Sequence, residues 1–151
     1  MRYDFEIQTS HFQFLVGDRG RGPTADTTIL WETGGAVATS PDLPEVVGVG
    51  TVRFGGNTRV SIEIIDTPLL AKEDWTELGR FSVTVTTGSL AIWGPEAANL
   101  SSMPAVPLAP GKFSGVAYVR GTEGSIDDAA PNGPDEYRIV LRPADEHNCE
   151  P

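Results

Sequence analysis

The sequence lacks several features on which common protein functions depend. It has a single cysteine, Cys149, so it can form no internal disulfide and no zinc-binding cysteine cluster. No apolar run approaches the roughly 20 residues that a membrane-spanning helix needs, and the amino-terminal segment lacks the apolar core of a signal peptide. We therefore expect a protein of the reducing cytoplasm that is not attached to a membrane.

Basic residues are also scarce. The chain has 11 Lys and Arg residues against 21 Asp and Glu residues, which gives a formal net charge of −10 at pH 7. Because nucleic-acid binding depends on basic patches that contact phosphates, we expect no direct binding of nucleic acid. The negative field instead favours association with a basic protein, although acidity also keeps a protein soluble when it has no such partner.

The usual signatures of enzymes are missing as well. Gly124-Ser125 is followed by Ile126-Asp127 and does not complete the G-x-S-x-G motif of a hydrolase nucleophile. The glycines of 17–22, GDRGRG, lack the strand–turn–helix context of a phosphate-binding loop. His11 is expected to be a structural residue of a strand, and His147 lies in a tail too loose to hold a metal ion. We expect no catalytic residue, no metal and no cofactor.

Alternation of apolar and polar residues is the main pattern that the sequence does contain. A period of two is typical of half-buried β-strands, and Gly and Pro residues supply turns between the alternating segments. Strands are expected within 3–16, with a bend at Thr9-Ser10, and at 27–31, 46–54, 58–66, 80–93, 106–108, 112–120 and 136–142. This pattern predicts an all-β fold: a single-domain antiparallel β-sandwich of eight to ten short strands over residues 1–143, followed by a flexible tail over 144–151.

The same alternation predicts faces and turns. In the last strand, Tyr137, Ile139 and Leu141 are expected to point inward, and Arg138, Val140 and Arg142 to lie on the other face. Gly55-Gly56-Asn57 and Thr87-Gly88 each separate two strand-like runs, which predicts two hairpins. The segment 69–78 is the sole helix candidate, and a loop with one helical turn fits it nearly as well.

Acidic residues gather in three places: Glu63 with Asp66, the segment 73–77, and the loop before the last strand. Carboxylates in that loop could pair with Lys and Arg residues of a basic partner, where they would take the place of substrate phosphates. A solvated loop with no task is the alternative. The candidate partner-binding residues are Glu123, Asp127, Asp128, Asp135 and Glu136.

Four short motifs occur in an order that is also found in a known family. They are SHFQFLV at 10–16, Ile29-Leu30-Trp31, Leu108-Ala109-Pro110-Gly111 and DEYRIVL at 135–141. In this order they resemble the competence protein J family, small bacterial proteins whose known members inhibit a competence-associated nuclease. Similar strand-rich proteins act as immunity proteins to nuclease toxins. The resemblance implies a β-sandwich and an inhibitory, non-catalytic role, and it assigns no functional residue here.

The leading hypothesis is therefore an acidic, immunity- or antitoxin-like inhibitor that occludes a basic protein such as a nuclease. Two alternatives stay open. One is a non-enzymatic module that binds a ligand or oligomerises, with an exposed edge strand such as 112–120 pairing between chains. The other is a carboxylate- or metal-dependent hydrolase, because any two strands could present a pair of carboxylates.

Overall fold

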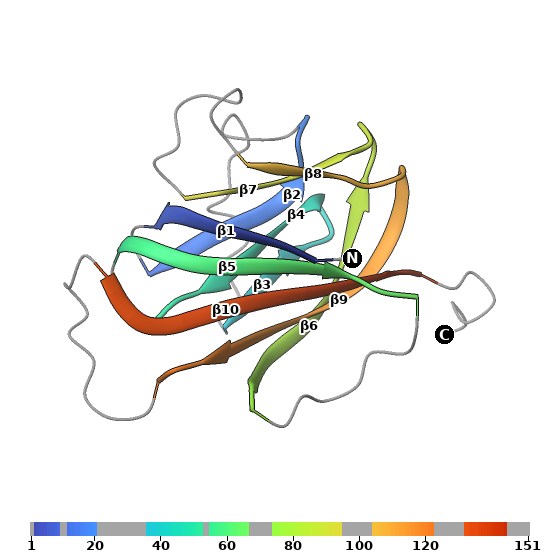
Figure 1. Ribbon diagram of the computed structural model, residues 1–151. Helices are drawn as coiled ribbons and strands as arrows, with labels where there is room; N and C mark the ends of the chain where they lie inside the picture. The colour runs from blue at the N-terminus through green and yellow to red at the C-terminus, as the bar shows by residue number, and fades with distance from the viewer. Residues whose placement is uncertain are drawn as a thin grey trace.

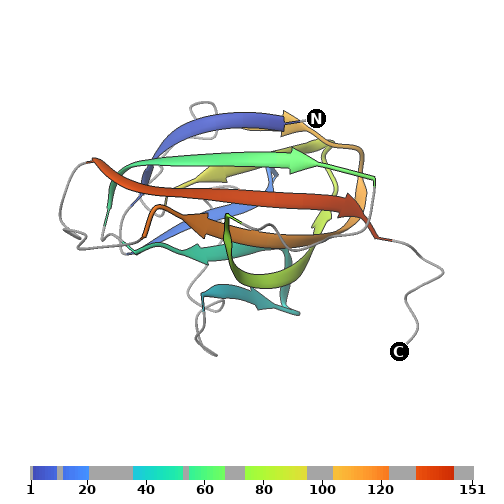
Figure 2. The ribbon, with the colours of Figure 1, turned by 60° about the horizontal axis from the view of Figure 1, so that its bottom comes forward.

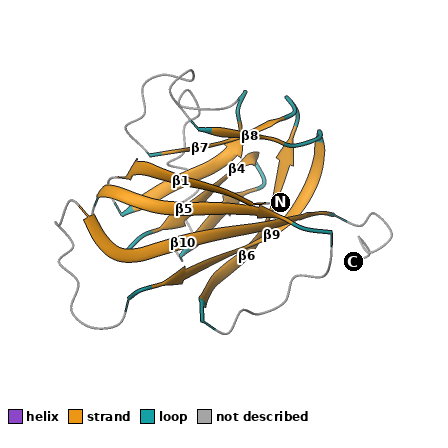
Figure 3. Ribbon diagram, viewed as in Figure 1, coloured by secondary structure: helices purple, strands orange, loops and turns teal. Residues whose placement is uncertain are grey.

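The computed structural model describes residues 2–9, 12–20, 36–52, 55–66, 74–94, 104–122 and 132–144. These ranges contain ten strands and no helix (Figure 3), which confirms the predicted all-β class. In this part of the chain, nothing helical could cross a membrane. The strands are β1 (Arg2–Thr9), β2 (Gln13–Asp18), β3 (Val37–Ser40), β4 (Leu43–Gly50), β5 (Gly56–Ile64), β6 (Thr76–Val85), β7 (Ser89–Trp93), β8 (Ala105–Pro107), β9 (Gly111–Arg120) and β10 (Asn132–Pro143).

The strands form two five-stranded sheets that pack against each other as a sandwich (Figure 1). Sheet A has the order β1-β5-β10-β9-β6, and sheet B has the order β3-β4-β2-β7-β8. In Figure 2, β1, β5 and β10 lie side by side above β3 and β4. The described pairings are antiparallel except that of β5 with β10. A parallel pair needs a long crossover, and the chain between these strands runs through β6 to β9.

The core lies between the two sheets and draws on both. Phe14 of sheet B and Tyr137 of sheet A meet there edge to face, with ring centroids 5.6 Å apart. Ile139 and Leu141 also point into this core, as the alternation predicted for the last strand. Burying one such side chain contributes about 1.5–3 kcal/mol, so this shared core is what holds the sheets together.

Gly115 of β9 makes room for an aromatic ring in the core. It lies opposite Phe81 of β6 and Leu141 of β10 in the strand register. A methyl group added at Gly115 would come within 2.4 Å of the Phe81 ring and 2.7 Å of the Leu141 side chain. The missing side chain at this position therefore lets β6 and β10 bring their large side chains together over β9.

Neither predicted hairpin forms. Gly55 lies between β4 and β5, and Gly56-Asn57 begin β5, but β4 belongs to sheet B and β5 to sheet A. β6 and β7 flank Thr87-Gly88 and are divided between the sheets in the same way. Both connections carry the chain from one sheet to the other. Of the predicted turn residues, Gly56 and Asn57 lie within β5, paired with Thr9 and Gln8, whereas the chain does bend at Thr87-Gly88. A glycine with positive φ, such as Gly88, suits a crossing between sheets as well as a hairpin.

Asp18, at the end of β2, holds the second of these crossings. Its carboxylate accepts hydrogen bonds from the backbone N–H and the hydroxyl of both Thr86 and Thr87, at 2.8–3.0 Å. Burial by itself raises the pKa of Asp18, but the hydrogen bonds from Thr87 and Thr86 outweigh it, so that the pKa lies below its usual value. The ionised carboxylate thus ties the corner at 86–88 to sheet B.

The segment around Trp75 is extended where a helix was the candidate. Asp74 and Trp75 form a turn, and β6 begins directly at Thr76, which pairs with Val119 of β9. Pairing along β9 therefore prevails over the partial helical stripe of 69–78. The earlier part of that candidate, 69–73, lies outside the described residues.

The strand at 112–120 is not an edge. β9 lies between β10 and β6, so its backbone groups are paired on both sides and cannot add a strand from another chain. The edges are β1 and β6 in sheet A and β3 and β8 in sheet B. The specific edge-pairing hypothesis at 112–120 is therefore wrong.

Other sequence predictions concern residues that the structure leaves undescribed. These are the strand at 27–31, both histidines and Cys149. At the carboxyl end the description reaches Ala144, whose amide donates a hydrogen bond to the Lys112 carbonyl at 2.9 Å. The flexible tail over 144–151 stays a prediction.

Candidate protein-binding face on sheet A

The outer faces of the two sheets differ in chemistry. On sheet B, outward side chains including Leu15, Val46, Ala91 and Trp93 form a second apolar cluster, and each of these four is at most 4% exposed. On sheet A the outward positions are largely charged, and many are exposed. Within the described ranges, the outer face of sheet A is therefore the broad sheet surface that a partner can reach.

Opposite charges alternate across this face. The register aligns the outward residues of β1, β5, β10, β9 and β6 in rows that run across the strands. Cross-strand pairs of opposite charge each contribute roughly 0.2–1 kcal/mol. The rows are Glu6, Arg59, Glu136 and Arg120; Asp4, Ser61, Arg138, Tyr118 and Glu77; and Arg2, Glu63, Val140, Val116 and Arg80.

Among the outward residues of these strands, basic side chains outnumber acidic ones, although the chain as a whole is acidic. Seven of the 11 basic residues lie here, against five acidic residues, while the whole chain has a net charge of −10. The excess negative charge of the chain therefore lies outside these strand positions. The basic residues are Arg2, Arg59, Arg80, Lys112, Arg120, Arg138 and Arg142, and the acidic ones are Asp4, Glu6, Glu63, Glu77 and Glu136.

A small apolar cluster lies within the charged surface. Val116, Tyr118 and Val140 point outward from β9 and β10 but are at most 3% exposed. The half-buried side chains of Ile65 and Trp75 pack over them. Trp75 precedes β6 at the edge of the sheet, so its ring covers part of the outer face.

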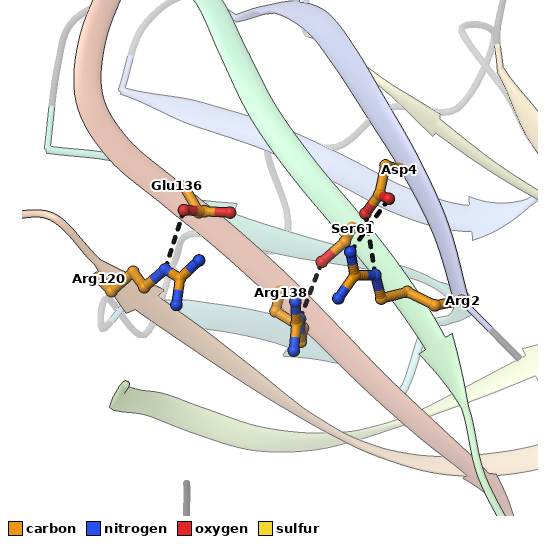
Figure 4. Close-up of polar contacts among 6 residues, drawn as sticks. All are labelled: Arg2, Asp4, Ser61, Arg120, Glu136 and Arg138. Atoms are coloured by element: carbon orange, nitrogen blue, oxygen red, sulfur yellow. Dashed lines mark hydrogen bonds and ion pairs between the residues drawn. The ribbon is translucent and has the colours of Figure 1, made fainter. Parts of the chain in front are cut away.

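Two arginines hold the Trp75 ring. The guanidinium carbon of Arg120 lies 4.3 Å from the ring centroid, and that of Arg138 lies 4.7 Å from it. Arg120 Nε is 2.9 Å from Glu136 Oε1, and Arg138 Nε donates a hydrogen bond of 3.0 Å to Ser61 Oγ (Figure 4). Each cation–π contact contributes about 0.5–1 kcal/mol at an exposed site, and the polar bonds fix the plane of each guanidinium.

Tyr118 lies at the bottom of this cluster and stays protonated at neutral pH. Burial raises the pKa of its hydroxyl, and the negative charge of Glu77 raises it further, while Arg80 acts in the opposite direction. Glu77 and Arg80 form an ion pair at 3.3 Å on the exposed side of the cluster. Since both partners are solvated, this pair adds little to stability.

The structure places the predicted partner-binding carboxylates in different environments. Asp135 is only 1% exposed and accepts a hydrogen bond of 2.8 Å from the Tyr137 hydroxyl. Glu136 lies on the outer face and pairs with Arg120. Glu123, Asp127 and Asp128 lie outside the described residues. Over the ranges that are described, no three His, Cys, Asp or Glu side chains gather as a metal site.

Sequence reasoning missed Trp75 and Arg120 as members of one cluster. The alternation correctly placed Arg138 on the outer face of the last strand. The alternation could not show that Arg138 lies near Arg120. Their proximity depends on the register of β9 with β10, which is set by residues far apart in the sequence. Trp75 was assigned to the helix candidate, and the one available signal was an aromatic residue just before a β-rich run.

Comparison with known proteins identifies solved structures with a similar architecture. No protein-family model and no curated protein matches the chain. Among solved structures, ComJ from Bacillus subtilis, an inhibitor of the DNA-degrading activity of NucA, matches with a TM-score of 0.64 over 94% of this chain and 96% of its own. The fold is similar to that of ComJ. Crocagin biosynthetic gene J matches similarly, with a TM-score of 0.62 over 95% of this chain and 97% of its own.

The likeness to ComJ is one of fold. Sequence identity is 15% to each of these two structures. At this level the shared strand arrangement is established, and the surface residues are free to differ. The resemblance expected from the motif order is therefore confirmed for the fold, and what the chain binds is a separate question.

Proposed function

We propose that this protein is a non-enzymatic inhibitor that binds a nuclease and blocks its access to DNA. The observation that carries the proposal is the fold shared with ComJ over nearly the full length of both chains. ComJ is an inhibitor of the DNA-degrading activity of NucA. The proposed site of action is the cytoplasm, in keeping with the single cysteine of the sequence.

Occlusion is the proposed mechanism. A nuclease must hold DNA phosphates and therefore presents basic groups in its cleft, and a partner of net charge −10 is drawn to such a surface. Glu123, Asp127 and Asp128, between β9 and β10, are the proposed contacts that stand in for phosphates. Glu136 extends this acidic group onto the outer face of sheet A. Asp135 is proposed to support the segment from within, because its carboxylate is buried.

An inhibition assay tests this function. Each DNase encoded in the genome of the source organism is purified and titrated with the protein while the cleavage of linear DNA is followed. We expect one of these enzymes to lose its activity completely near one molar equivalent. If every enzyme retains full activity in a large excess of the protein, or if the protein itself cleaves DNA, the proposed function is wrong.

A further inference from the structure

We infer that Trp75, Arg120 and Arg138 form a docking point on sheet A that binds carboxylate groups of a protein partner. One part of this inference, that the partner is a nuclease, rests on the proposed function. The docking point is centred on two arginines of sheet A, whereas the proposed stand-ins for phosphate are carboxylates. The two sets of residues meet at Glu136, which pairs with Arg120.

The first argument concerns hydrogen-bond donors. Arg120 and Arg138 each use Nε inside the protein, for Glu136 and Ser61 respectively (Figure 4). Among the described residues, the two guanidinium groups make no other hydrogen bond. The terminal nitrogens of both groups therefore have no acceptor in the described part of the chain, and we infer that an external acceptor binds them. Two such nitrogens bind one carboxylate through two parallel hydrogen bonds.

The second argument concerns preorganisation. Both guanidinium groups stack on the Trp75 ring, at 4.3 and 4.7 Å from its centroid, and Trp75 itself rests on the buried side chains of Val116, Tyr118 and Val140. Arginine side chains that are already ordered lose little conformational entropy when a partner binds. Trp, Tyr and Arg are also the residue types that contribute most to binding at protein interfaces.

Charge identifies a protein, and not a nucleic acid, as the occupant. Glu6, Glu63 and Glu136 alternate with arginines across this face. A continuous row of phosphates would meet these carboxylates and be repelled by them, and the chain as a whole is strongly acidic. A protein surface can instead present Asp and Glu to the arginines and Lys or Arg to the neighbouring carboxylates. The expected partner patch is therefore acidic at its centre, with basic residues at its rim.

A photo-crosslinking experiment tests this docking point in the cells that make the protein. A benzophenone amino acid replaces Glu77, whose exposed side chain lies beside Tyr118 in the register, and in a control protein it replaces the exposed Asp42 between β3 and β4. We expect a discrete protein adduct from position 77 and none from position 42. Its crosslinked peptide should contain Asp or Glu residues.

Two double variants carry the decisive comparison. R120A/R138A removes the guanidinium groups from Trp75, whereas R2A/R142A removes the same charge from the same face without touching that ring. With the purified partner, calorimetry should show at least a tenfold weaker Kd for R120A/R138A and less than a threefold change for R2A/R142A. Thermal unfolding confirms that both variants are folded, and R120K/R138K should bind with intermediate affinity because lysine keeps the charge but loses the fork.

The possible outcomes separate this inference from the proposed function. A nuclease that is inhibited equally by wild type and R120A/R138A overturns the docking point and leaves the function standing. An arginine-dependent adduct with a protein that is not a nuclease, found when no DNase of the organism is inhibited, supports the docking point and contradicts the function. The inference is also overturned by the absence of an adduct at position 77, or by binding of a 20-base-pair DNA duplex that is lost in R120A/R138A.

Discussion

The Tyr137 hydroxyl donates a hydrogen bond of 2.8 Å to Asp135 Oδ2 and accepts one of 2.9 Å from the Val52 amide. Asp135 and Tyr137 belong to the first half of β10, and Val52 belongs to the connection from β4 to β5. A carboxylate that the sequence suggested for a partner therefore fixes the entry of the last strand to a crossing between the sheets.

Removal of the Tyr137 hydroxyl should destabilise the protein. Tyr137→Phe keeps the ring against Phe14 but leaves the buried Asp135 carboxylate and the Val52 amide without this partner. We expect a loss of about 1–3 kcal/mol in the free energy of unfolding, measured by urea denaturation. Asp135→Asn should lose stability too. The double variant should lose less than the sum of the two single losses, because the residues share one bond. Strict additivity would show that they act independently.

The free energy of unfolding should decrease at acidic pH, because the Asp18 carboxylate becomes protonated there. Because the pKa of this carboxyl is lower in the folded protein, its contribution is complete above the unfolded value of about 3.9 and is lost as the pH falls through the folded value. Asp18→Asn should cost about 1.5–3 kcal/mol at pH 7. Since Asn does not titrate, the variant should also lose less stability than wild type between pH 5 and the acid transition. Parallel pH profiles of wild type and variant would exclude this role of Asp18.

A methyl group at Gly115 should disturb the core. Gly115→Ala forces the added carbon against the Phe81 ring and Leu141, and overpacking of this kind costs typically 1–3 kcal/mol. Gly50→Ala is the matched control, because the nearest atom to its added carbon is the Ala36 carbonyl oxygen at 3.4 Å, an ordinary contact. Thermal unfolding should show a clear decrease in Tm for the first variant and little change for the second. Equal effects would mean that β9 has space at this position.

Neutralising the acidic segment should slow association with the inhibited nuclease. The variant E123Q/D127N/D128N removes three negative charges while Asp135 stays in place. Long-range attraction acts mainly on the rate of encounter, so we expect the association rate constant to fall by about tenfold at low salt and the dissociation rate to change much less. Stopped-flow measurements across a salt series test this. An unchanged association rate constant with the same salt dependence would show that the acidic segment does not contribute to binding.

Most of the strands, and the inward face of the last one, could be predicted from the sequence because period-two alternation is a local signal, but β3 was not among the predicted strands. In β10 the residues that point into the core between the sheets, Tyr137, Ile139 and Leu141, are those that the pattern assigned to the inward face. Helix-like spacing around Trp75 was misleading, because pairing of Thr76 with Val119 involves residues some forty positions apart. Local propensity carries no information on such a partner.

The arrangement of strands into two sheets could not be predicted. Gly88 permits either a hairpin or a crossing, and the observed crossing is held by hydrogen bonds from Thr86 and Thr87 to Asp18 of β2, a residue distant in the sequence. The candidate docking point was hidden for the same reason. Trp75, Arg120 and Arg138 come together only once β6, β9 and β10 are side by side in sheet A.

Competition between the protein and DNA is the most direct measurement of occlusion. Initial rates of the inhibited nuclease are measured over a range of DNA concentrations at several fixed concentrations of the protein. If the protein covers the DNA-binding cleft, the apparent KM for DNA rises with inhibitor concentration and kcat stays constant. A fall in kcat at constant KM, or the isolation of a stable complex that contains nuclease, DNA and this protein together, would contradict inhibition by occlusion.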